Sequence, residues 1–109
     1  MRLTRGNNAQ LPGTLNMSSS DEAITIKAVD DSGLPVSCAW QLTYDKGFEY
    51  SERIGSLSST PHTFTATGTS VQYTPPSNAL QSWQGRQHAI IIAMPSDGSA
   101  TRSLQITIG

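Results

Sequence analysis

The stretch from Val36 to Tyr44 alternates strictly between two kinds of side chain, and this pattern constrains the fold more than any other part of the chain. Small or polar residues separate the apolar and aromatic ones, which are Val36, Cys38, Trp40, Leu42 and Tyr44. A period of two is typical of a β-strand with one buried face, because successive side chains in a strand point to opposite sides. Trp40 is the largest apolar group in this face, so we expect the core to be built around it.

Shorter segments repeat this alternation and are separated by Asp, Gly and Pro, which favour tight turns. The predicted strands cover residues 22–29, 36–44, 62–67, 71–74, 88–94 and 100–108, with a weaker one over 48–54. The composition is 36% hydrophobic and only 14% charged, which suits short strands joined by turns better than salt-bridged helices. We therefore predict an all-β sandwich of about seven or eight strands, in which residues 77–83 are able to form a short helical turn.

The chain is predicted to contain one folded domain, over residues 21–109, preceded by an N-terminal arm or linker over residues 1–20. The arm is polar and rich in Gly, Asn and Ser, and its few apolar anchors are Leu3, Leu11, Leu15 and Met17. The residues that we expect at the centre of the domain core share an apolar character and an inward position in the alternation. They are Ile26, Trp40, Leu42, Tyr73, Leu104 and Ile106.

Charge and cysteine content exclude several classes of protein. The chain has seven basic and eight acidic residues and no block of like charge, so we expect no nucleic-acid partner and no membrane insertion. Its first ten residues lack the apolar core of a signal peptide. Cys38 is the single cysteine, which rules out a disulfide within the chain, and we expect it to be a small buried apolar residue.

Four segments resemble the bacterial immunoglobulin-like domains of invasin- and intimin-type surface proteins. Ala28–Val36 is similar to their strand-turn-strand unit with its D…G.PV core, and Trp40 falls where these domains place a core aromatic residue. Gly68–Pro76 is similar to their GT…YT.P segment, and Ala89–Ile108 is similar to their closing hairpin. The insertion over 46–61 is longer than the family pattern. The resemblance implies an immunoglobulin-like two-sheet Greek-key sandwich that acts as a spacer or adhesion module.

No catalytic or cofactor site is expected. His62 and His88 are the only histidines and stand in no catalytic or metal-binding motif, so we predict that the chain is not an enzyme and holds no cofactor. Weak candidates for a calcium site are Asp30, Asp31 and Asp97, whose turns fall at the same end of an immunoglobulin-like sandwich. These three carboxylates are also good turn formers, and they fall short of the six to eight oxygen ligands that calcium takes.

Residues 88–94 are apolar on both faces, although a two-sheet sandwich buries only one face of each strand. The second face must therefore be either exposed or covered, and the candidate covers are the arm, the segment 77–83 or another chain. The candidate interaction residues are apolar side chains of these segments: Leu11, Leu15, Trp83, Ile90, Ile92 and Met94. Trp83 and Tyr50 are also candidates for stacking on a sugar ring.

The predicted function is a non-enzymatic structural or adhesive module of a bacterial surface protein or of a virion or filament assembly. Its partners would be neighbouring domains or identical subunits, and its location would be extracellular, at the cell surface or in a virion. The alternative is a carbohydrate-binding accessory module of a secreted hydrolase.

Overall fold

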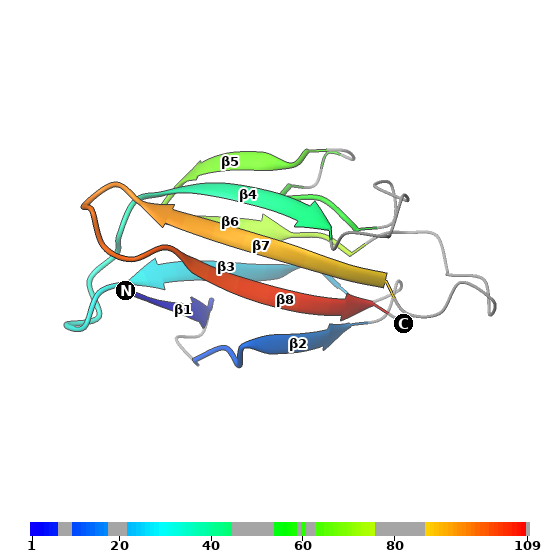
Figure 1. The fold of residues 1–109 in the computed structure, drawn as a ribbon, viewed down its shortest axis with the longest axis horizontal. Coiled ribbons are helices and arrows are strands. Elements are labelled where there is room, and N and C mark those ends of the chain that lie inside the picture. Colours follow the sequence, from blue (N-terminus) through cyan, green and yellow to red (C-terminus); the bar gives the residue numbers. More distant parts are fainter. Residues whose placement is uncertain are drawn as a thin grey trace.

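Eight β-strands form two sheets within the part of the chain that the computed structural model describes (Figure 1). The described residues are 1–6, 10–17, 22–44, 54–58, 60, 63–75 and 87–108. The strands are β1 (Arg2–Arg5), β2 (Thr14–Met17), β3 (Ile24–Val29), β4 (Cys38–Tyr44), β5 (Thr65–Gly68), β6 (Ser70–Tyr73), β7 (Gln87–Pro95) and β8 (Arg102–Ile108).

The two sheets have the strand orders β1-β3-β6 and β2-β8-β7-β4-β5. The chain changes sheet at every connection except β4–β5 and β7–β8, so both sheets combine strands that are distant in sequence. Strands β4, β7 and β8 correspond to the central antiparallel sheet of an immunoglobulin sandwich, and β3 and β6 correspond to its opposing sheet. The prediction of an all-β, immunoglobulin-like two-sheet sandwich is confirmed. The helical turn expected over 77–83 lies outside the described residues, as does the weak strand expected over 48–54 except for Ile54.

Residues 1–20, expected to be an arm, instead contribute one strand to each sheet. Strand β1 pairs antiparallel with β3, and β2 pairs parallel with β8. The apolar residues of this segment join the core instead of reaching toward a neighbour. Leu15 and Met17 alternate with exposed residues as a half-buried strand requires, but four residues are too short a run for the period to stand out.

The expected strand over residues 36–44 begins two residues later, at Cys38. The preceding residue Val36 donates its backbone N–H to the carbonyl of Ala28, 2.9 Å away, and so still belongs to the turn that leaves β3. From Val36 to Leu42 the side chains alternate between buried and exposed positions as predicted. Trp40 is 1% exposed, and its indole N–H donates to the carbonyl of Gly68 over 2.9 Å, which satisfies its polar atom.

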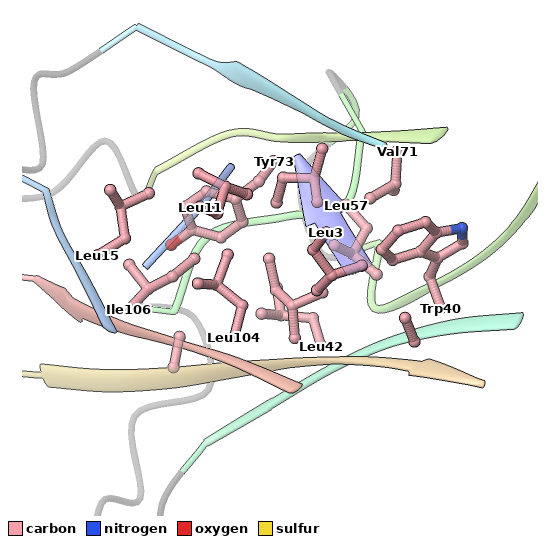
Figure 2. Packing of buried hydrophobic residues seen from close by; sticks show 14 of the residues in the cluster. Leu3, Leu11, Leu15, Trp40, Leu42, Leu57, Val71, Tyr73, Leu104 and Ile106 are labelled. Atoms are coloured by element: carbon pink, nitrogen blue, oxygen red, sulfur yellow. The ribbon is translucent and has the colours of Figure 1, made fainter. Parts of the chain in front are cut away.

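Between the sheets lies one core of apolar side chains (Figure 2). It includes all six residues that were expected there, namely Ile26, Trp40, Leu42, Tyr73, Leu104 and Ile106. It also includes Ile54, the last residue of the weak strand expected over 48–54, and Leu57, which we expected in a loop. The described residues include no helix long and apolar enough to cross a membrane.

A buried hydrogen bond ties the 54–58 segment to β6. The Tyr73 hydroxyl donates to the carbonyl of Ile54 over 2.7 Å, and Ser56 exchanges backbone hydrogen bonds with Thr74. Gly55 lies in this corner with φ of 89°. Burial of the Tyr73 side chain raises its pKa above the usual range for tyrosine.

Replacement of Tyr73 with phenylalanine is expected to change how stability depends on pH. In an unfolded chain the tyrosine hydroxyl ionises near pH 10, whereas the buried group keeps its proton. The unfolded state therefore binds fewer protons above about pH 10, and stability falls as the pH rises. Tyr73→Phe removes this fall but leaves the Ile54 carbonyl without its donor, at a cost of about 1–3 kcal/mol at neutral pH.

Urea unfolding of both proteins from pH 7 to 11.5 measures this effect, and the other two tyrosines cancel in the difference between them. The free energies of unfolding of parent and variant are expected to converge above pH 10. Two curves that stay parallel over the whole range would show that Tyr73 ionises as readily in the folded state as in the unfolded one.

Candidate interaction face

Strand β7 has one face in the core and one on the outside of the five-stranded sheet. Ala89, Ile91 and Ala93 are completely buried, at 0% exposure each. Ile90 and Ile92, on the opposite face, are only half-buried, and Met94 is 40% exposed. The sequence pattern was thus read correctly as apolar on both faces, and the outer side chains form an apolar stripe along the middle of the sheet.

Cross-strand register defines what surrounds this stripe, because directly paired residues share a face. Ile90 lies between Thr43 of β4 and Gln105 of β8, and Ile92 lies between Gln41 and Ser103. On the far side of β4, Thr65 pairs with Gln41 and Thr67 pairs with Ala39. We call this surface the outer face, and its central members are Ala39, Gln41, Thr43, Thr65, Thr67, Ile90, Ile92, Met94, Ser103 and Gln105.

The outer face carries no charged group among the side chains that the structure describes. Its polar members are hydroxyl- or amide-bearing residues, which give up hydration at lower cost than ionised groups do. An apolar centre with an uncharged polar surround has the composition of a protein interface, where charged residues are depleted at the core. Gln41, Thr65 and Gln105 were not predicted to belong to this surface. The sequence of a single strand does not show which residues of the neighbouring strands lie beside it.

Two of the predicted interaction residues do not belong to this surface. Leu11 and Leu15 are each 8% exposed and pack into the core, because the segment that carries them joins the sandwich. Trp83 and Tyr50, the candidates for stacking on a sugar, lie outside the described residues, as does His62. His88 is part of β7, where its backbone pairs with Thr107.

Of the three aspartates considered for calcium, Asp30 and Asp97 accept hydrogen bonds within their own turns, and Asp31 is an exposed turn residue. Asp30 accepts the backbone N–H groups of Ser32 and Leu34 at 2.9 Å each. Asp97 accepts the backbone N–H of Ser99 at 2.8 Å and also its hydroxyl, and these hydrogen bonds, the hydroxyl first, lower the pKa of the Asp97 carboxyl. Although both turns lie at one end of the sandwich (Figure 1), the described residues hold no cluster of three metal-binding side chains.

Cys38 is buried at the end of the core nearest the N-terminus. Its sulfur lies 3.7 Å from the sulfur of Met1 and 3.7 Å from the carbonyl oxygen of Val36. Burial, and secondarily the negative charge of Asp97, raise the pKa of the Cys38 thiol. A reactive cysteine needs an accessible, electropositive setting that lowers the thiol pKa, so this residue serves as packing.

Comparison with known protein families finds no family model that matches the chain. Comparison with curated proteins finds no matching sequence. Among solved structures, the fold is similar to that described as "Crystal structure of CBD12 from CALX1.2", with a TM-score of 0.47 and 10% sequence identity. That alignment covers 99% of this chain but only 44% of the other chain.

Proposed function

We propose that this chain is a non-enzymatic immunoglobulin-like module that binds a protein neighbour through the outer face. The observation that carries the proposal is the stripe of Ile90, Ile92 and Met94 along the central strand β7. In a soluble sandwich these positions ordinarily hold polar residues, because the outside of the sheet meets water. Three apolar side chains in succession on one side of a strand favour a surface that another protein covers.

A protein partner fits this face better than a nucleic acid or another highly charged ligand. The described outer face offers no cation to pair with a phosphate or a carboxylate. Hydroxyl and amide groups around an apolar centre allow hydrogen bonds at the rim of an interface without burying an unpaired charge. The proposed partner is a neighbouring domain or an identical subunit, whose matching surface would be similarly uncharged.

The shape of the molecule favours a role as a spacer. Its principal dimensions are 44 × 24 × 24 Å, and the strands run along the long axis. Strand β1 starts toward one end of this axis and β8 finishes toward the other (Figure 1). A module of this shape can join further domains end to end and leave the broad outer face free for lateral contact.

The resemblance of four segments to invasin- and intimin-type domains supports a more specific proposal. We place the module in a bacterial surface protein, or in a virion or filament assembly, with an adhesive or spacing role. Immunoglobulin-like folds host many functions, so this part of the proposal rests on the sequence motifs and not on the architecture.

The test is a double substitution, Ile90→Thr and Ile92→Thr, which removes apolar surface while it keeps β-branched residues that favour strands. The matched control is Leu34→Thr, which alters an equally apolar side chain, 61% exposed in the β3–β4 turn and away from the outer face. In sedimentation equilibrium we expect the parent and the control to self-associate as concentration rises. The double variant is expected to stay monomeric over the same range.

Thermal melts must show that the double variant folds, which is expected because both side chains are only half-buried. Identical monomeric behaviour of the parent and all variants up to millimolar concentration would contradict self-association. Equal association of the parent and the folded double variant would place the contact elsewhere on the molecule.

A further inference from the structure

A groove of about 210 Å³ opens where the first part of the chain passes from one sheet to the other. One wall comes from the start of β1, another from the connection that precedes β2, and the third from the start of β8. The lining residues are Arg2, Leu3, Gln10, Leu11, Pro12, Gly13, Arg102, Ser103 and Leu104.

The groove is held open by backbone pairing on both sides of the connection. The N–H of Leu11 donates to the carbonyl of Leu3 over 3.2 Å, and the N–H of Gln105 donates to the carbonyl of Gly13 over 3.0 Å. These bonds attach one end of the connection to β1 and the other to β8. The space between them is therefore a consequence of the fold and does not depend on a single side-chain rotamer.

Two arginines and no carboxylate line this groove. The Nε–H of Arg102 donates to the carbonyl of Met1 over 3.0 Å, which holds that guanidinium beside the start of β1. Within the part of the chain that the structure describes, the Arg102 side chain forms no other hydrogen bond or ion pair, and the Arg2 side chain forms none. The groove thus concentrates positive charge and leaves most guanidinium N–H donors available.

Apart from the arginines, the lining combines the polar residues Gln10 and Ser103 with an apolar patch. Leu3, Leu11 and Leu104 are buried at this site, and Pro12 adds a further apolar wall. A ligand that satisfies both parts carries an anionic head and a short apolar body. A planar carboxylate suits the head best, because a guanidinium binds it through two parallel hydrogen bonds.

We infer that this groove binds a small organic carboxylate, with the head on Arg2 and Arg102 and an aliphatic body against Leu3, Leu11 and Leu104. The volume lies below the range of about 300–1,000 Å³ that accommodates drug-sized ligands, so the body has only a few carbons. A free short-chain acid and the C-terminal carboxylate of a peptide share this chemistry. The groove shares only Ser103 with the outer face, and the inference holds whether or not the module self-associates.

The experiment is a titration of the ¹⁵N-labelled full chain with butanoate, followed by amide chemical shifts at constant ionic strength. Saturable shifts are expected at Gln10, Leu11, Gly13, Ser103 and Leu104. Acetate, which lacks the aliphatic body, is expected to bind about tenfold more weakly, consistent with the loss of two buried methylene groups. Butylamine, which has the body but the opposite charge, is expected to cause no saturable shift.

Variants assign the head of the ligand to the two arginines. Arg2→Gln and Arg102→Gln are each expected to weaken butanoate binding about five- to tenfold. A tenfold loss corresponds to one charge-assisted hydrogen bond of modest strength, which is reasonable because both guanidinium groups are partly solvated. The matched control is Arg5→Gln, which removes the same charge from the same strand but not from the groove. It is expected to leave the affinity unchanged.

Arg102→Gln also removes the hydrogen bond to Met1, so Arg2→Gln and Arg102→Lys provide separate tests. Arg102→Lys keeps the charge but loses the planar pair of donors, and an intermediate affinity is expected. Linear shifts without saturation, or equal effects of Arg5→Gln and Arg2→Gln, would overturn the inference, because they indicate general screening of charge.

A peptide ending in leucine, tested with a free and with an amidated C-terminus, then separates the two sources of the carboxylate. Binding of the free-ended peptide identifies a chain terminus as ligand, whereas binding of butanoate alone identifies a small acid.

Discussion

Replacement of Gly55 with alanine is expected to destabilise the protein by roughly 4 kcal/mol or more. A loss of this size is expected because the change both strains the backbone and breaks a buried hydrogen-bond network. A β-carbon at this position would stand 2.3 Å from the carbonyl oxygen of Thr74 and 2.8 Å from the Tyr73 hydroxyl. The first atom is backbone that pairs with Ser56, and the second belongs to a buried side chain held by a hydrogen bond, so the backbone must move. That movement breaks the Tyr73–Ile54 hydrogen bond and the Ser56–Thr74 pairing.

A second cost comes from the φ of 89° at Gly55, which disfavours any residue that has a β-carbon by about 1–2 kcal/mol. Gly33 isolates this contribution, because its φ is 83° but no atom lies within 4 Å of the position of an added β-carbon. Chemical denaturation of Gly55→Ala and Gly33→Ala therefore separates crowding from conformational strain. Equal losses in the two variants would mean that the corner at Gly55 relaxes freely.

Trp40→Ala is expected to cost roughly 3–5 kcal/mol, as large-to-small changes in well-packed cores do. Trp40 is 1% exposed and spans the contact between the two sheets, so its loss leaves a cavity that surrounding strands cannot fill without shifting. The change also leaves the carbonyl of Gly68 without the indole donor. Thermal and urea unfolding measure the effect, and the expected result is a large loss of stability.

Leu34→Ala is the control for Trp40→Ala, because Leu34 is the most exposed large apolar residue in the described part of the chain. Its removal is expected to change stability by less than about 0.5 kcal/mol. If Trp40→Ala unfolds at the same denaturant concentration as Leu34→Ala, the prediction that Trp40 forms the centre of the core is wrong.

The strands predicted correctly are those in which a period of two continues long enough to be distinguished from chance. Strand β4 shows this best, because buried and exposed side chains alternate over the seven positions from Val36 to Leu42. The same reasoning placed Ile26, Tyr73 and Ile106 in the core. It also recognised that β7 is apolar on both faces, which is the basis of the proposed interaction face.

The strands and core residues that were missed belong to short segments in polar surroundings. Strands β1 and β2 contain four residues each, and Leu57 stands between two Ser residues, so no periodicity marks them as buried. Ile54 ends a segment in which the alternation is weak. Their burial depends on partners far away in sequence, such as β8 for β2 and Tyr73 for Ile54. The groove was missed for the same reason, since Arg2 and Arg102 are brought together only by the fold.

The division of the first twenty residues between both sheets has a mechanical consequence. Strand β1 is fastened to β3 and β2 is fastened to β8, while β1 starts and β8 finishes toward opposite ends of the long axis (Figure 1). Tension applied through these two ends runs along the strands, nearly at right angles to the hydrogen bonds that join them. The hydrogen bonds of each strand pair are then loaded together, in shear. They cannot open one after another, as they do when the two strands of a hairpin are pulled apart at its open end. The hydrogen bonds between β2 and β8 must then break together before β8 can slide past β2.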